Sequence, residues 1–349
     1  MKRIILLAWL LFLGSLAQAH DFVVTLDGQK VYFNIKSQKN RTAEVTYNGS
    51  IAQHAPSYFE GELTIPEKVK HNDIVYTVTG IGSKAFSGAD KLTGIILPSG
   101  IQTIGDFAFE GCTSLSKIIF PGGIVKFGQG VFFRCDKIQD ISFGSDWKEL
   151  DLKMFRWSDS LTVVTIPAKI ERIQNLKSLK HLESVSIDIN NARFSAIDGV
   201  LYNKNHETLY GCPRAYRGKL RIAEGTRQIT AGALIDCPNI EQIDLPESLE
   251  AVSFREFSRM PALKRIIFRN EQPVTTAQIG TEGFLVLQVL DPGIELIVPK
   301  KAKAAYQEAL VQQAGLYTEP EGAVSYPVKA EMMPAKKNII GVKDFAKYE

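Results

Sequence analysis

The sequence is poor in the side chains that catalytic and metal sites usually need. It contains five histidines and four cysteines in 349 residues, and no two histidines have the spacing of paired zinc ligands. It has no G-x-S-x-G motif, no phosphate-binding glycine loop, and no recurring pair of acidic residues of the kind that glycosidases use. We therefore expect a protein that is not an enzyme and that needs no metal or cofactor.

The chain also lacks an excess of either charge. It has 41 lysines and arginines against 38 aspartates and glutamates, and two of the basic residues, Lys2 and Arg3, precede an apolar run near the beginning. Nucleic acids and anionic membranes attract proteins through basic patches, which this balance gives no reason to expect. We predict neither class of partner.

Only one stretch is apolar enough to resemble a membrane segment. Residues 4–16 are almost entirely apolar, Lys2 and Arg3 precede them, and the small residues Ala17 and Ala19 follow. This is the pattern of a secretory signal peptide removed after Ala19, and the run is shorter than the roughly 20 residues that a membrane helix needs. We expect an exported chain with no membrane span after cleavage, either secreted, at the cell surface or in the periplasm.

What the sequence does contain is a repeat with a period of 23 residues. One column of the repeat consists of Phe86, Phe109, Phe132 and Phe155. The other columns include Ile81, Ile104, Phe127, Leu150 and Ile173; Ala89, Cys112, Cys135 and Ser158; and Ile95, Ile118, Ile141 and Val164. A fixed period of this length indicates a solenoid, because a single copy cannot bury its apolar face without stacked neighbours.

Each copy combines a short strand with a tight turn. Segments such as "GIILP", "KIIFP" and "QIDLP" alternate between apolar residues that point inward and residues that point outward. The "AF" segments are too short for a full helix and predict tight or 3₁₀ turns. We expect the strands of successive copies to pair in parallel, about 4.8 Å apart.

The repeat resembles the BspA-type leucine-rich repeat, whose pattern is I-G-x-x-A-F-x-x-C-x-x-L-x-x-I-x-L-P. The matching segments are "IGSKAFSGADKLTGIILP", "IGDFAFEGCTSLSKIIFP" and "ITAGALIDCPNIEQIDLP". The resemblance implies a β-rich leucine-rich-repeat solenoid with short turns and 3₁₀ segments. It also implies a secreted or surface protein of bacteria, used in adhesion and protein binding.

The departures from the repeat predict the domain organisation. The segment "DFVVTLDGQKVYFNI" alternates around an Asp-Gly turn and predicts a β cap, while "IDGVLYN" and "ETLYGCP" predict a β-hairpin that interrupts about seven repeats. A last strand near residue 299 is followed by a helix that opens after Pro299. The predicted segments are a signal peptide at 1–19, an N-terminal β cap at 20–60, repeats at 61–187, a β-hairpin insertion at 188–222, repeats at 223–299, and a helix with a tail at 300–349.

The cysteines fit the repeat better than they fit chemistry. Cys112 and Cys135 share a column with Ala89 and Ser158, so this position requires a small side chain rather than a thiol. Export permits disulfides, and parallel side chains in adjacent copies are poorly oriented for one. A disulfide between Cys212 and Cys237 stays open, because the repeat does not define their relative placement.

The outward positions of the strands, with the residues that flank them, form the candidate binding face. They are Ile96, Lys117, Ile119, Asp140, Ser142, Val163, Thr165, Asp244, Arg265 and Ile267. We expect the three isoleucines among them to face solvent, where adjacent apolar side chains can mark a contact surface. They could equally serve only as strand formers on a curved sheet.

Two functions are compatible with such a face. The first is a protein-binding or adhesion module that contacts an extracellular protein of a host or of a neighbouring cell. The alternative is a non-catalytic glycan-binding accessory protein of the cell envelope, which would present aromatic side chains on its surface. Most of the repeated phenylalanines belong to the predicted core, which favours the first function.

Overall fold

The computed structural model describes residues 20–48, 59–123, 126–252, 254–273, 293–308, 338–343 and 345–348. The predicted signal peptide lies outside the described residues. The chain forms two compact units, one made of Met1–Leu161 and Arg172–Leu179 and the other of Thr162–Glu171 and Lys180–Glu349.

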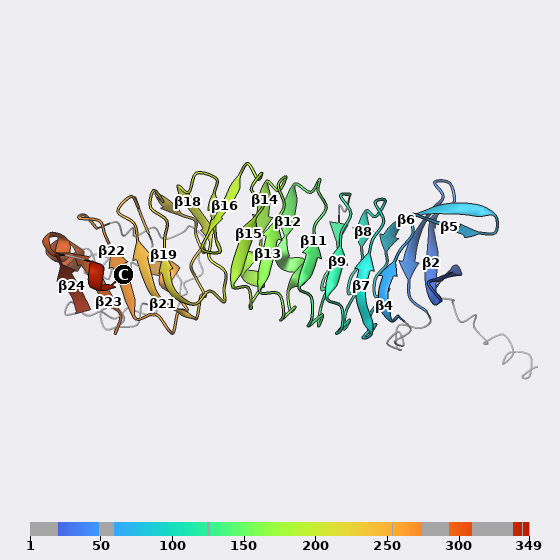
Figure 1. The fold of residues 1–349 in the computed structure, drawn as a ribbon, viewed down its shortest axis with the longest axis horizontal. Helices are drawn as coiled ribbons and strands as arrows, with labels where there is room; N and C mark the ends of the chain where they lie inside the picture. The colour runs from blue at the N-terminus through green and yellow to red at the C-terminus, as the bar shows by residue number, and fades with distance from the viewer. Residues whose placement is uncertain are drawn as a thin grey trace, which may run out of the picture. The chain divides into compact units, whose positions relative to one another are not determined.

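The first unit contains two larger sheets and a separate pair of strands (Figure 1). One sheet has the order β1 (Phe22–Leu26), β2 (Gln29–Ser37), β3 (Thr42–Thr46), β6 (Ile74–Ile81), β8 (Thr103–Ile104) and β10 (Lys126–Phe127), and β5 (Lys68–His71) pairs with β6. The other has the order β11 (Asp140–Ser142), β9 (Lys117–Ile119), β7 (Leu92–Ile96) and β4 (Gly61–Thr64). A separate pair joins β12 (Glu149–Asp151) to β14 (Arg172–Gln174).

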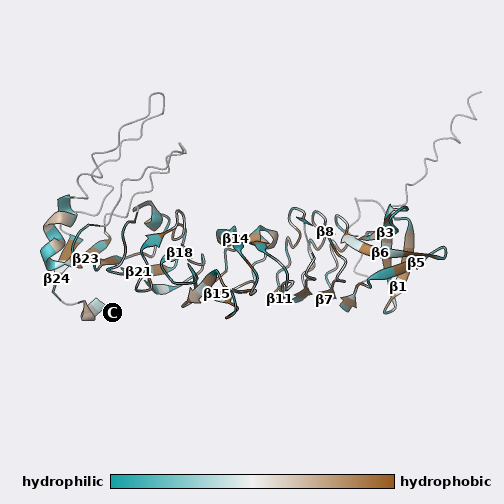
Figure 2. Ribbon diagram, turned by 90° about the horizontal axis from the view of Figure 1, so that it is seen from above, coloured by the Kyte–Doolittle hydropathy of each residue, from teal (hydrophilic) through white to brown (hydrophobic). Residues whose placement is uncertain are grey.

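The register of the strands follows the repeat. In the parallel pair β7–β9, Ile95 lies opposite Ile118, and in β9–β11 Ile118 lies opposite Ile141. Each partner is therefore one period further along the chain, as the column of isoleucines predicts. The alternation is confirmed as well, because Ile95 is buried while the next residue, Ile96, is only half-buried. Hydrophobic and hydrophilic residues accordingly occur along the same strands in Figure 2.

The core of the first unit is a stack of phenylalanine rings. Phe86, Phe109, Phe132 and Phe155 are fully buried, and the centroids of successive rings are 5.2, 5.3 and 5.2 Å apart with nearly parallel planes. The turns that carry them are tight, and the fourth is the 3₁₀ helix η1 (Leu152–Phe155), as predicted. Offset stacking of buried rings adds about 0.5–1.5 kcal/mol per pair to the energy of burial.

The column that follows the phenylalanines supplies a hydrogen-bond donor. Cys112 Sγ donates to the carbonyl of Phe86 at 3.1 Å, Cys135 Sγ to that of Phe109 at 2.9 Å, and Ser158 Oγ to that of Phe132 at 3.1 Å. Each donor thus links its own repeat to the repeat before it, and we call each repeat a rung of the stack. The sequence identified the size of this position and not its polar role.

Glycine recurs where one rung approaches the backbone of the next. A Cβ atom on Gly105 would lie 2.4 Å from the backbone nitrogen of Ser83, and one on Gly128 would lie 2.4 Å from that of Asp106. No side chain fits at such distances. The I-G pair of the repeat is therefore explained by close backbone packing rather than by an unusual backbone angle.

An antiparallel hairpin lies at the predicted N-terminal β cap. β1 pairs with β2 in antiparallel fashion, and Asp27 and Gly28 connect them with positive φ angles of 47° and 79°, which is the backbone of a two-residue type I′ turn. β3 pairs antiparallel with β2 and parallel with β6. The antiparallel strands are thereby joined to the parallel strands of the first repeats.

The second unit contains three sheets. They are the pair β13 (Val163–Ile166) with β15 (Ser184–Ile187); the sheet β16 (Phe194–Ile197), β17 (Val200–Asn203), β18 (Thr208–Gly211) and β20 (Gln228–Ile229); and the sheet β19 (Gly218–Arg221), β21 (Ile240–Leu245), β22 (Arg265–Phe268), β23 (Glu295–Pro299) and β24 (Ile339–Val342). β19 to β24 pair in parallel throughout.

In the second unit, β17 and β18 form an antiparallel pair within the segment where a hairpin was predicted. A further hairpin, β16–β17, turns at Asp198 and Gly199 and was not predicted. Because β18 also pairs in parallel with β20, the hairpin is continuous with the repeat strands. After β23, the 3₁₀ helix η4 (Lys300–Ala302) leads into an α-helical segment at 303–308, within the range where a helix was predicted.

Candidate functional site

In the first unit, the predicted face lies on β4, β7, β9 and β11. Ile96 is opposite Ile119, and Ile119 is opposite Ser142. Both isoleucines are half-buried, whereas Ser142 and Asp140 are exposed. The structure therefore brings five predicted residues of this unit onto one face, although its isoleucines are less exposed than predicted.

A glycine lets an ion pair form across this face. Lys117 Nζ lies 3.4 Å from Glu62 Oε1, and the strand between them contributes Gly94. A Cβ atom on Gly94 would lie 2.9 Å from Glu62 Cγ, so the two long side chains use the space that the glycine leaves. Both partners are partly exposed, and an exposed pair of this kind contributes at most about 1 kcal/mol to stability.

Two of the predicted residues, Val163 and Thr165, belong to the second unit. They lie on β13, opposite Ser184 and Ser186 of β15. Val163 is 48% exposed, and Thr165 is exposed as well. They share a face with small hydroxyl side chains and not with a further apolar residue.

The predictions for β21 and β22 are wrong about exposure. Ile267 is completely buried and Asp244 is only 5% exposed, while Arg265 is partly buried. Ile297, which lies opposite Ile267 on β23, is also completely buried. A solvent-facing position was expected from the strand alternation, and the physical reason for the difference is a segment that covers these strands.

The covering segment is the 3₁₀ helix η7 (Ala346–Tyr348) together with Phe345. Tyr348 is 7% exposed and packs with Ile267 and Ile297, and Phe345 packs against the same cluster. β24 brings the chain to this position by pairing in parallel with β23. We call Phe345 and η7 the covering segment, and the outward sides of β19, β21, β22 and β23 the covered face.

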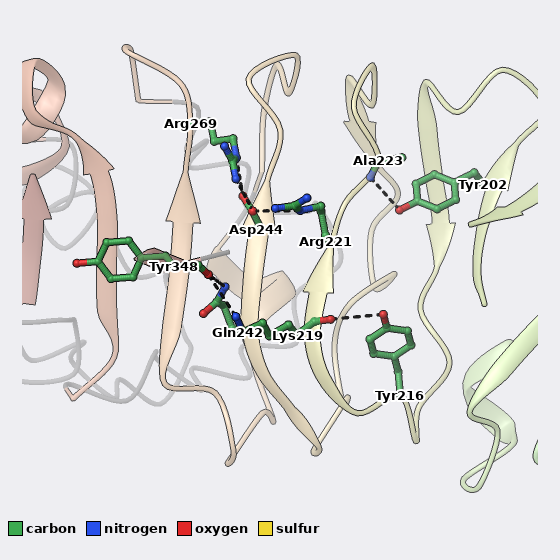
Figure 3. Close-up of polar contacts among 9 residues, drawn as sticks. All are labelled: Tyr202, Tyr216, Lys219, Arg221, Ala223, Gln242, Asp244, Arg269 and Tyr348. Atoms are coloured by element: carbon green, nitrogen blue, oxygen red, sulfur yellow. Dashed lines mark hydrogen bonds and ion pairs between the residues drawn. The ribbon is translucent and has the colours of Figure 1, made fainter. Parts of the chain in front are cut away.

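Polar groups of the covered face hold the segment by its backbone (Figure 3) and by its rings. Gln242 Nε2 donates to the backbone carbonyl of Tyr348 at 2.8 Å, and Lys219 Nζ lies 3.5 Å from the same oxygen. The guanidinium carbon of Arg265 is 5.1 Å from the centroid of the Tyr348 ring, and that of Arg269 is 5.2 Å from that of Phe345.

Carboxylates fix both arginines in place. Asp244 accepts two hydrogen bonds from Arg269, at 2.9 and 2.7 Å, and lies 3.5 Å from Arg221 Nε (Figure 3). Glu295 Oε2 accepts from Arg265 at 2.9 and 2.6 Å. Bidentate pairing of this kind fixes the orientation of a guanidinium as well as its position. The planar groups are therefore already oriented toward the aromatic rings.

Buried Tyr202 and half-buried Tyr216 lie beside the covered face, and neither acts as a base. Burial raises the pKa of Tyr202, whose hydroxyl oxygen accepts a hydrogen bond from the Ala223 backbone at 3.2 Å. Burial also raises the pKa of Tyr216, which donates to the Lys219 carbonyl at 3.5 Å (Figure 3). A raised pKa keeps both phenols neutral, so they serve as hydrogen-bond partners.

The cysteines do not form the disulfide that the sequence left open. All four lie in the described residues as buried thiols, so the pairing of Cys212 with Cys237 is not present. Cys237 Sγ is instead directed at the backbone carbonyls of Cys212 and Pro213, at 3.9 and 3.6 Å. In the described ranges, no three histidine, cysteine, aspartate or glutamate side chains gather to hold a metal ion.

An aromatic patch lies on the turns of the first unit, away from any predicted site residue. Trp157 is 41% exposed, and its ring meets that of Phe133 edge to face, with centroids 5.3 Å apart. Arg156 stacks on Trp157 at 4.5 Å, and Arg134 stacks on Phe133 at 5.3 Å. The one available signal was the break in a glycine column at residues 88, 111, 134 and 157, where the last two positions are Arg and Trp.

The stacked parallel strands and the ring column define a repeat protein. The chain belongs to the BspA type leucine-rich repeat family: residues 66–196 and 207–285, more than half of the sequence, match the family in six copies. This confirms the resemblance found in the sequence. Among the described residues, no helix is long and apolar enough to cross a membrane.

Several solved structures are similar to this chain. The pneumococcal vaccine antigen PcpA is 17% identical over 83% of this chain and 96% of its own, with a TM-score of 0.45. A leucine-rich repeat protein from Bacteroides ovatus is 20% identical over 80% and 71%, with a TM-score of 0.48. A leucine-rich cell surface protein from Faecalibacterium prausnitzii is 20% identical over 81% and 86%, with a TM-score of 0.44. The comparison with curated proteins gave no match.

Proposed function

We propose that this chain is an exported leucine-rich repeat protein that binds another extracellular protein through the outward faces of its parallel strands. The observation that carries the proposal is the face of the first unit, where Ile96 of β7 and Ile119 of β9 lie side by side. The charged residues around them are Lys117 on β9 itself, Glu62 on β4 and Asp140 on β11. A small apolar centre with charged side chains around it is the usual composition of a protein interface. Export is proposed from the leader-like residues 1–19.

The experiment uses the tagged chain from residue 20 onward, screened against arrays of extracellular proteins and of glycans. The test variant is Ile96→Ser with Ile119→Ser, and the control is Lys126→Ala, on the other sheet of the same unit. We expect the test variant to lose at least about ten-fold in affinity for a protein found on the array, because two central contacts are removed. Equal binding by both variants would show that the partner uses another surface.

A second candidate function is glycan binding by the aromatic patch. Exposed aromatic rings are the feature that this function requires, and Trp157 provides one beside Arg134 and Arg156. The same arrays separate the two functions, with Trp157→Ala as the variant. Loss of glycan binding in that variant, together with unchanged binding by the Ile96→Ser, Ile119→Ser chain, would favour the glycan function.

A further inference from the structure

Two strands of this protein have nearly the same sequence and different surroundings. β9 lies within "KIIFP", and β22 lies within "RIIFR". The second isoleucine is half-buried in the first case, Ile119, and completely buried in the second, Ile267. The strands themselves do not explain this difference. The covering segment does, because Tyr348 and Phe345 lie against Ile267 and its neighbour Ile297.

The covered face holds the segment through contacts that any peptide of similar composition could make. Gln242 and Lys219 both contact a backbone carbonyl oxygen, a group that every peptide has. Ile267 and Ile297 form an apolar floor, and the two guanidinium groups lie over two aromatic rings. A cation over an aromatic face is attracted to the ring whether or not the ring belongs to the same chain.

Hydrogen bonds within the sheet hold the two arginines of the face. Asp244 fixes Arg269, and Glu295 fixes Arg265, through hydrogen bonds between strands of the same sheet. Gln242 Oε1 accepts a further hydrogen bond from Arg265 at 3.4 Å. This bond orients the Gln242 side-chain amide, which donates to the Tyr348 carbonyl. A site that is organised by its own strands keeps its shape when its occupant leaves, and this lowers the cost of binding another one.

We infer that the covered face is a binding site for peptide segments with two aromatic side chains three residues apart, and that Phe345 and Tyr348 occupy it as an internal ligand. The inference deepens the proposed function and rests on it: a protein partner would present such a segment and displace the covering one. The face of the first unit, with Ile96 and Ile119, is a separate surface and has no such cover among the described residues.

The test uses the chain from residue 20 to 349 with Phe345→Ala and Tyr348→Ala. Its probe is a fluorescent peptide with the sequence of residues 343–349, KDFAKYE, followed by anisotropy. We expect the double variant to bind this peptide and the unmodified chain to bind it at least about ten-fold more weakly, because a tethered segment competes at an effective concentration of about a millimolar. A peptide with alanine in place of both aromatic residues is the control and should bind neither chain.

Gln242→Ala added to the double variant should weaken peptide binding, whereas Ile96→Ser with Ile119→Ser added to it should not. The second addition separates the two surfaces, so that failure of the peptide test leaves the proposal for the first unit to be judged by the arrays alone. No binding of the peptide to the double variant, or equal binding to both chains, overturns the inference.

Hydrogen exchange of the unmodified chain decides the matter if the double variant does not fold. An internal ligand leaves its site by local opening, so the amides of residues 345–348 should exchange faster than those of β22 and β23. Exchange of all three segments at one common rate would mean that the covering segment is a fixed part of the unit, and that result also overturns the inference.

Discussion

At the scale of the residue, Cys112 illustrates how a small core position acquires a polar function. Its thiol donates to the carbonyl of Phe86, as Cys135 and Ser158 do for the next two rungs. The carbonyl is buried, and a buried acceptor is costly when it lacks a partner. Serine and cysteine are thus interchangeable at this position because both are small and both carry a donor.

The burial of Cys112 predicts a thiol that does not react in the folded chain. Burial raises the pKa of its thiol well above the ordinary value of 9.0, and the neighbouring Cys135 adds to the shift. Only the thiolate attacks a disulfide reagent, so the folded chain should not react with a chromogenic disulfide reagent at about pH 8. In denaturant, all four cysteines should react. A Thr113→Cys variant, exposed beside Cys112, is the control and should react at once.

The same shift sets the direction of a pH effect. The folded chain keeps the Cys112 proton above 9.0, while the unfolded chain releases it there, so the free energy of unfolding should fall as the pH rises through that value. Urea unfolding at a series of alkaline pH values measures this fall, and Cys112→Ser should reduce it. An unchanged pH dependence in that variant would contradict the assignment to Cys112.

At the scale of the element, the stacking of rungs depends on glycines that allow close backbone contact. We predict that Gly105→Ala lowers the free energy of unfolding by about 1–3 kcal/mol, since its Cβ would press on the backbone of the preceding rung. Gly94→Ala is the matched control, because its Cβ would meet only the flexible side chain of Glu62, and it should change stability by less than about 0.5 kcal/mol. Urea unfolding followed by circular dichroism measures both. Equal losses of stability in the two variants would show that close contact with the backbone of Ser83 is not the reason why glycine is needed at position 105.

The strands and turns were predictable wherever the 23-residue pattern is regular. The phenylalanine column, the register of the isoleucines and the Asp-Gly hairpin all follow from spacing and from turn chemistry, and the structure confirms them. The hairpin at Asp198 and Gly199 was not predicted, although it has the same Asp-Gly turn as the first hairpin. Its turn residues were sufficient to predict it.

The binding face was predicted less well, and the reason is physical. Alternation along a strand determines which side chains point outward, but not whether something covers them. Ile119 and Ile267 have the same place in nearly identical strands, and only a segment about eighty residues further along the chain makes them differ. Contacts of such long range leave no periodic trace, although Phe345 and Tyr348 after "NIIGV" were a visible aromatic pair.

At the scale of the whole molecule, the proposed export predicts that the leader is removed from the chain. Cells that express the full chain should process it after Ala19 and deliver it outside the cytoplasm, because the leader combines Lys2, Arg3, an apolar run and small residues. Fractionation with N-terminal sequencing of the mature chain measures this. Leu6→Arg with Leu7→Arg should keep the protein in the cytoplasm at full length. An unprocessed cytoplasmic wild-type chain would contradict the prediction.

The ring stack in the first unit has a mechanical consequence. Phe109 contacts the rings of Phe86 and Phe132, and each rung is held by its two neighbours. A load applied along such a stack passes through every interface in series, so the weakest interface opens first and the repeats separate one after another. Each rung that opens releases 23 residues of chain, about 80 Å when drawn out. Under shear the first unit would lengthen in steps, and its outer repeats would unfold while its inner repeats remain folded.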